Sequence, residues 1–358
     1  MSDLKKNYIT EVKFDRSNKT QKFPSQLVHA SDLENILINN LPKVQTSWFK
    51  FQSEWAYNSY QSMRDMDKYL ILIYLIQKNF RHYADTFQIV SEETMYSFSS
   101  FEIEKINLIE ISESLRIPKE TVRRKINELS KEGIIERTGK RITLKNNAFN
   151  KQRPVQTIKT LTSFLSICIK MIADESNIVN ETSKVDIENF IRKNFSLVWR
   201  FFFETQIPNL VDWRNYYGDL ETWIVTATVL INQSHKLRDL YKGKGITLDF
   251  DQMTNEEKFN KVYDFIFSNS EKIVGVNASS IAEITGVPRA TVIRKLKYAT
   301  KIGIITKDKK QLYLTKRMPG PKMKNFSIVA QRVTMRVYKF IATFIEIYKN
   351  KEQLPGSK

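Results

Sequence analysis

The sequence predicts a mainly α-helical fold made of two similar units. The first observation is an internal repeat, because residues 111–144 recur without a gap as residues 281–314, 170 positions later. We refer to these segments as copy one and copy two. The second observation is that apolar residues recur at helical spacing on both sides of each copy. The third is that 358 residues, 41% of them hydrophobic, suffice for two units with real cores.

Each copy is predicted to contain a short helix, a tight turn and a longer helix. In copy one the short helix is Ile111–Leu115, and the turn reaches Pro118, because proline fixes its φ and suits the first position of a helix. The longer helix ends at Gly133, which fits the left-handed residue that follows a helix. The equivalent positions in copy two are Ile281–Thr285, Pro288 and Gly303.

The longer helix is amphipathic, and a β-hairpin follows it. In copy one Val122, Ile126 and Leu129 recur at spacings of four and three, so this face is predicted to pack on the rest of the unit. Residues 134–135 and 142–144 read as paired strands around a basic tip, 138–140. Copy two repeats these features at Val292, Leu296, Ala299, 304–305, 308–310 and 312–314. Both units are therefore predicted to be helix-turn-helix domains with a β-hairpin wing.

At these residues the sequence resembles the winged helix-turn-helix domains of bacterial transcription regulators, particularly the MarR (multiple antibiotic resistance regulator) family. The shared string, "P-x-x-T-V-x-R-K-[IL]…G-I-I", covers about a tenth of the chain in each copy. The resemblance implies that the second helix enters the major groove of DNA and that the wing contacts the backbone or the minor groove. The chain departs from that family in its length and in fusing two units, so the family's ligand site does not transfer directly.

The charge of the chain points to a polyanionic partner. The net charge is +18, although an AT-rich genome would also produce excess lysine. The placement of the basic residues favours binding to a polyanion. Residues 116–153 include twelve basic residues and four glutamates, and residues 289–324 include twelve basic residues and one acidic residue, Asp308. A face that is only solvated would mix the two signs. Double-stranded DNA is therefore the expected partner.

The candidate DNA contacts lie on the polar face of the longer helix and on the wing. Arginine suits guanine or phosphate, whereas the wing lysines suit phosphate. Where the copies differ, at positions 120/290, 123/293 and 127/297, the two DNA half-sites should differ as well. The candidates are Lys119, Glu120, Thr121, Arg123, Arg124, Asn127, Lys131, Lys140, Arg141, Arg289, Thr291, Arg294, Lys297, Lys301, Lys309 and Lys310.

The flanking segments predict three regions: an N-terminal arm at 1–30, a first unit at 31–175 and a second at 176–358. A helix capped by Ser31 and Glu34 is predicted to run to Leu41 and to end at Pro42. Similar lead-ins begin at Asp65 and Asp219, and an amphipathic helix closes each unit. Two interpretations of the closing helices stand: they pack one unit on the other, making one chain equivalent to a dimer, or each completes its own core.

We expect a sequence-specific, cytoplasmic DNA-binding protein of the nucleoid, acting as a transcription regulator on an asymmetric operator. The alternatives are a plasmid or phage type of replication initiator and a structural chromosome-associated protein. No nucleotide, nuclease or hydrolase motif indicates an enzyme, and we expect no cofactor, no metal and no membrane span. A single cysteine, Cys168, excludes a disulfide within the chain. An effector stays unknown, as does the choice between a monomeric pseudo-dimer and a homodimer.

Overall fold

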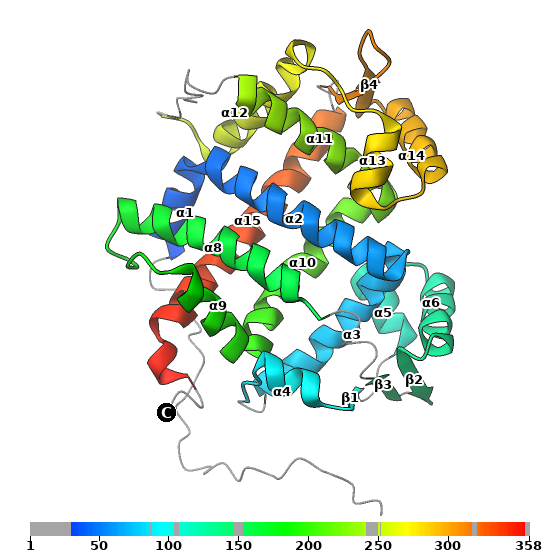
Figure 1. Ribbon diagram of the computed structural model, residues 1–358, viewed down its shortest axis with the longest axis vertical. Helices are drawn as coiled ribbons and strands as arrows, with labels where there is room; N and C mark the ends of the chain where they lie inside the picture. Colours follow the sequence, from blue (N-terminus) through cyan, green and yellow to red (C-terminus); the bar gives the residue numbers. More distant parts are fainter. Residues whose placement is uncertain are drawn as a thin grey trace, which may run out of the picture.

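The computed structural model is mainly helical, with two small antiparallel sheets (Figure 1). It describes residues 30–85, 88–103, 107–139, 141–145, 153–240, 250, 252–316 and 321–354. The predicted N-terminal arm, except for Ala30, lies outside the described residues, and so do Lys140 and the glycine-containing segment 242–245.

The first half of the chain begins with long helices and contains copy one. Its elements are α1 (Ala30–Asn39), α2 (Leu41–Met63), α3 (Met66–Asp85), α4 (Glu92–Ser97), β1 (Ser100–Ile103), α5 (Leu108–Leu115), α6 (Lys119–Lys131), β2 (Ile135–Thr138), β3 (Arg141–Lys145) and α8 (Val155–Glu175). One sequence prediction is wrong here. Pro42 does not simply end a helix, because α1 already ends at Asn39 and Pro42 lies in the first turn of α2, where a missing amide hydrogen does no harm.

The second half follows the same order and contains copy two. Its elements are α9 (Lys184–Lys193), α10 (Phe195–Tyr217), α11 (Leu220–Leu240), α12 (Asn255–Ser268), the short 3₁₀ helix Ser270–Lys272, α13 (Ala278–Thr285), α14 (Arg289–Lys301), β4 (Ile305–Lys307), β5 (Tyr313–Thr315), α15 (Pro321–Lys349) and a second 3₁₀ turn, Lys351–Gln353.

The two sheets differ in size. In the first half β3 lies between β1 and β2, and Phe101 pairs with Leu144 across the sheet. In the second half β4 pairs with β5, and a single bridge from Val276 to Tyr313 stands where a third strand would be. β1 was not predicted, because the alternation of a four-residue strand is too short to distinguish it from a loop.

The two halves exchange their terminal helices. The first helix of each half packs on the closing helix of the other half, α1 on α15 and α9 on α8. The long helices cross between halves as well, with α3 against α10 and α11 against α2. Each closing helix also packs on its own half, α8 on α2 and α15 on α10. Both interpretations of the closing helices therefore describe real contacts, and one continuous apolar core joins the halves.

One described helix, α8, is long and apolar enough to cross a membrane by length and composition alone. One face of the helix is buried in protein, because Ile158, Leu161 and Leu165 are fully buried and the helix contacts α1, α2 and α9, whereas Val155 and Ile167 are exposed. Core helices of water-soluble proteins have the same composition. Burial against three helices is the arrangement expected of such a core helix.

Candidate nucleic-acid interface

In copy one, α5 and α6 form a helix-turn-helix. Asn107 caps α5 by accepting a hydrogen bond from the Ile109 amide, and α5 ends at Arg116, whose φ is 52°. The hydroxyl of Ser112 donates to the carbonyl oxygen of Ile117 at 2.7 Å and closes the turn. Pro118 then precedes α6 with a φ of −52°, which its ring fixes, and it stands at the cap position, one residue before the first residue of the helix. The turn therefore forms where the sequence predicts it.

Copy two has the same arrangement with different side chains. Asn277 caps α13 through the Ser280 amide, and the helix ends at Gly286, whose φ is 72°. The hydroxyl of Thr285 stabilises this turn, as that of Ser112 does in copy one. It donates to the carbonyl oxygen of Ile281 and accepts a hydrogen bond from the Val287 amide at 3.1 Å. Pro288 precedes α14, and its φ of −53° is within one degree of the φ of Pro118.

The inner faces of α6 and α14 are fixed to the core. Val122, Ile126 and Leu129 are fully buried, and α6 packs on α3. Their counterparts in α14, which packs on α11, are equally buried: Val292, Leu296 and Ala299. The predicted apolar faces are thus observed in both copies, and they hold the two helices with their polar faces outward.

A pair of lysines missed by the sequence analysis also docks these helices. Lys125 in α6 lies 2.7 Å from a carboxylate oxygen of Asp65, and Lys295 in α14 binds Asp219 in the same way. Each aspartate also accepts a backbone amide hydrogen bond at the start of α3 or α11, from Lys68 or Thr222. Both lysines stand at the same position of the repeat, and this recurrence was the only indication in the sequence that they have a common role. Their aspartate partners lie far away along the chain.

The polar face of each helix is open to solvent, as the site predictions require. Thr121 and Thr291 are half-buried at the helix starts, and Lys140 lies outside the described residues. The other candidates are exposed: Lys119, Glu120, Arg123, Arg124, Asn127, Lys131, Arg141, Arg289, Arg294, Lys297, Lys301, Lys309 and Lys310. Along the molecule, α6 and α14 lie at the same edge, with α5 on the inner side of α6 and α13 on the inner side of α14 (Figure 1).

The two polar faces differ in their own ion pairs. In α6, Arg123 lies 2.6 Å from Glu120, and Arg124 lies 3.9 Å from Glu128. Copy two has no acidic residue between Arg289 and Lys307. Such exposed pairs contribute little stability, so they do not prevent the arginines from reaching DNA. They do make the face of α6 less positive than that of α14.

The wings are held in different ways. In copy one the guanidinium of Arg141, on β3, lies 3.2 Å from the carboxylate of Glu102, on β1. The side chain of Arg137 donates a hydrogen bond to the carbonyl oxygen of Gly139. In copy two Asp308 faces inward and accepts hydrogen bonds from the amides of Gly275, Lys310 and Leu312. Asp308 therefore orders the hairpin tip and presents Lys309 and Lys310 to solvent.

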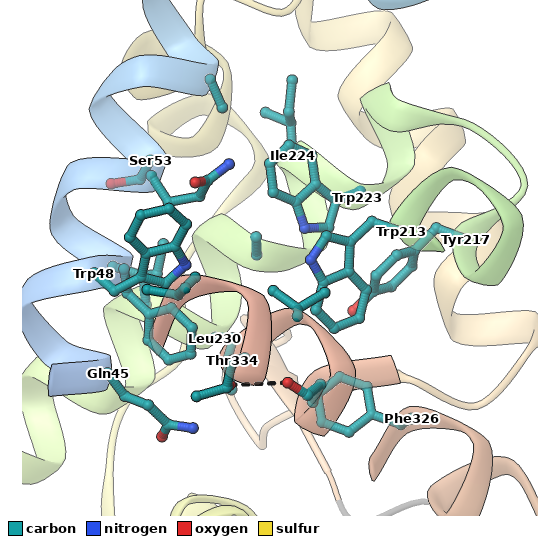
Figure 2. A pocket seen from close by; sticks show the side chains of 18 of the residues that line it. Gln45, Trp48, Ser53, Trp213, Tyr217, Trp223, Ile224, Leu230, Phe326 and Thr334 are labelled. Carbon is teal, nitrogen blue, oxygen red and sulfur yellow. Dashed lines mark hydrogen bonds between the residues drawn. The ribbon is translucent and has the colours of Figure 1, made fainter. Parts of the chain in front are cut away.

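A narrow aromatic cavity lies where the halves meet, between α2 and the helices α10, α11, α12 and α15 (Figure 2). Its volume is about 60 Å³, the share of about two water molecules, which is too small for an aromatic ligand unless side chains move. Gln45 lines it with a buried Oε1 atom that accepts no hydrogen bond from the described residues. Other lining residues are Trp48, Trp213, Trp223, Tyr263 and Phe326.

The aromatic cluster at 195–203 belongs mainly to the core. Phe195, Trp199, Phe202 and Phe203 are buried and their rings contact one another in α10. These side chains therefore form part of the core that joins the two halves.

Comparison with known proteins supports the interface in copy one. The family model of the DeoR-like helix-turn-helix domain matches residues 102–145. This range covers α5, α6, both strands of the wing and the end of β1. Neither a curated protein nor a solved structure matches the chain. The matched domain supports DNA as the partner and a role in regulating transcription; its description is DeoR-like, so the finer resemblance to the MarR family remains a resemblance of the quoted string.

Proposed function

We propose that the chain is a sequence-specific transcription regulator in which two winged helix-turn-helix units act together as a pseudo-dimer on one asymmetric operator. The observation that carries this proposal is the pair of exposed basic helices, α6 and α14, at one edge of the molecule (Figure 1). Their inner faces are fixed by equivalent residues of the two halves. The matched helix-turn-helix domain supports the same role for copy one.

The exchange of terminal helices supports the pseudo-dimer. Homodimeric helix-turn-helix proteins place two recognition helices in successive major grooves, about 34 Å apart. Here one chain supplies both helices, so nothing requires the two half-sites to be identical. Glu120 of copy one corresponds to Ala290 of copy two, and Asn127 corresponds to Lys297. A carboxylate accepts from the cytosine amino group, whereas alanine contacts a thymine methyl, so the half-sites should differ in sequence.

Selection of binding sites from random double-stranded DNA tests the proposal. We expect two unlike half-sites whose centres are separated by about one helical turn of DNA. A clean inverted repeat would contradict the asymmetric operator, and tandem direct repeats would favour a replication initiator. Binding without sequence preference would favour a structural chromosome-associated protein.

The dependence of affinity on salt separates these possibilities further. If the two units neutralise some 6 to 10 phosphates, a plot of log affinity against log salt concentration should have a slope of about −5 to −9. A shallow slope would instead indicate that the winged helices bind protein. The proposal involves neither a catalytic step nor a cofactor, and it places the protein in the cytoplasm with the DNA.

A further inference from the structure

Two arginines reach from one half of the chain to the helix-turn-helix of the other half. At the end of α2, Arg64 donates from Nη1 to the carbonyl oxygen of Gly286 at 2.7 Å. In α10, Arg214 donates from Nη1 to the carbonyl oxygen of Arg116 at 3.2 Å. Gly286 and Arg116 occupy the same position of the repeat, and each is the left-handed residue that ends the first helix of its helix-turn-helix. The same acceptor is thus held from the opposite half in both copies.

Both hydrogen bonds lie at the surface, at places where helices of opposite halves touch. Arg214 also binds both carboxylate oxygens of Asp67, at 2.7 and 3.0 Å, in the first turn of α3, and only 14% of its side chain is exposed. This forked pairing is the geometry in which arginine binds a carboxylate most firmly. At the other contact Gln61 lies so near that a Cβ atom on Gly286 would be 2.8 Å from Gln61 Cγ. The helices themselves touch, α2 with α13 and α10 with α5.

We propose that Arg64 and Arg214 are positioning residues that fix the separation and angle of the two recognition helices, and thereby set the half-site spacing that the protein accepts. This inference rests on the proposed function. Each arginine ties the turn before one recognition helix to a long helix of the other half, so α6 and α14 cannot shift independently. One added base pair displaces a half-site by about 3.4 Å and rotates it by about 34°. A rigid pair of helices tolerates such a change poorly, and a loosened pair tolerates it better.

Arg64→Gly and Arg214→Lys are the informative variants. Asp65 and Asp219 begin equivalent helices, so the counterpart of Arg64 in the second half is Gly218, which also has a positive φ. Glycine at position 64 therefore keeps the backbone and removes the cross-half hydrogen bond. Lysine at position 214 can still pair with Asp67 but lacks the fork that also reaches the Arg116 carbonyl. Arg200→Ala is the matched control, because Arg200 lies on α10 and pairs with Glu204 of the same helix.

The experiment measures affinity of the full-length chain for duplexes carrying the selected half-sites at the optimal spacing, at spacings changed by one or two base pairs, and for a single half-site. Linked binding exceeds single-site binding by roughly a hundredfold or more when geometry allows it. We expect the wild-type chain and Arg200→Ala to lose most of that gain at altered spacings. We expect Arg64→Gly and Arg214→Lys to lose about tenfold or less there and to keep the single-site affinity.

Spacing profiles as steep as that of the wild-type chain would overturn the inference. It would also be overturned if both variants weakened binding to every duplex equally, including the single half-site, because that pattern indicates general loss of structure. Failure of the proposed function looks different: the wild-type chain itself would then gain nothing from a second half-site at any spacing.

Discussion

Arg116 and Gly286 occupy the same position of the repeat, but an arginine adopts the left-handed conformation of this position less readily than a glycine does. Both end the first helix of a helix-turn-helix with a positive φ, 52° and 72°. A side chain with a Cβ atom is disfavoured there by roughly 1–2 kcal/mol, and glycine is not. We expect Arg116→Gly to raise the free energy of unfolding by up to about 1 kcal/mol, since glycine's extra freedom in the unfolded chain offsets part of the gain.

Gly286→Ala is the reciprocal change, and it should destabilise the protein. Here the unfavourable φ is joined by the close approach of Gln61. Urea unfolding of both variants measures the two effects. Equal stability of all three proteins would show that the turn adapts without strain.

Arg124 of α6 and Arg294 of α14 stand at the same position of the repeat, and both are exposed. If they contact guanine, Arg124→Ala and Arg294→Ala should each lower specific affinity by roughly 1 to 3 kcal/mol and relax the preference at one half-site only. Lys140→Ala should weaken binding to all sequences alike. Lys159→Ala is the control, since this exposed lysine lies on α8, outside both α6 and α14 and their wings. Unchanged base preferences in both arginine variants would contradict the assignment of α6 and α14 as readers.

At the scale of the element, α6 and α14 are docked by more than apolar contacts. Asp65 both accepts the Lys68 amide at the start of α3 and binds Lys125 of α6. Asp65→Ala removes a helix cap, worth about 1 kcal/mol, and takes a carboxylate away from a lysine that is only 8% exposed. We expect the free energy of unfolding to fall by about 2 to 3 kcal/mol, measured in urea. Glu113→Ala, on the exposed side of α5, is the control, and an equal effect of the two changes would refute the docking role.

The wing of copy two should respond to acid. Asp308 accepts hydrogen bonds from three backbone amides, and these lower the pKa of its carboxyl below the ordinary value of 3.8. The amide of Leu312 has the largest effect, and those of Gly275 and Lys310 add to it. A lowered folded-state pKa means that the stabilisation is present above the unfolded value and is lost as the pH falls through the folded value. We therefore expect the hairpin to stay ordered at neutral pH and to loosen only below about pH 3.8. Amide exchange at 309–312 measures this, and Asp308→Ala should loosen the hairpin at every pH.

These elements also show how far the sequence alone could go. Its repeat, prolines and glycines located both helix-turn-helix turns, because turn chemistry is local: Pro118 and Gly133 act on their own backbone. It missed the inward role of Lys125, which a helical pattern assigns to the polar side, since its partner Asp65 lies sixty positions earlier. It could not choose between the two roles of the closing helices. That choice depends on which distant surface covers an apolar face, and apolar periodicity is the same in either case.

At the scale of the whole molecule, the exchanged helices make each half incomplete. A chain limited to residues 30–175 would lack α9, which covers α8, and α10, which covers α3. Buried Phe80 of α3, for example, would lose its ring contacts with Phe195 and Phe203 of α10. Burying a phenylalanine side chain contributes roughly 1.5–3 kcal/mol, and a domain is stable by only about 5–15 kcal/mol in total.

We therefore expect the isolated first half to fold only by pairing with a second copy of itself, in which α1 of one copy packs on α8 of the other, where α9 packs in the full chain. Light scattering with circular dichroism across a dilution series measures this. The expected result is a helical dimer that loses helix content on dilution, whereas the full-length chain keeps its helix content at every concentration. A folded monomer of the first half would show that the contacts between the halves are dispensable. In that case the fixed separation of α6 and α14, on which single-chain recognition of an operator depends, would lose its structural basis.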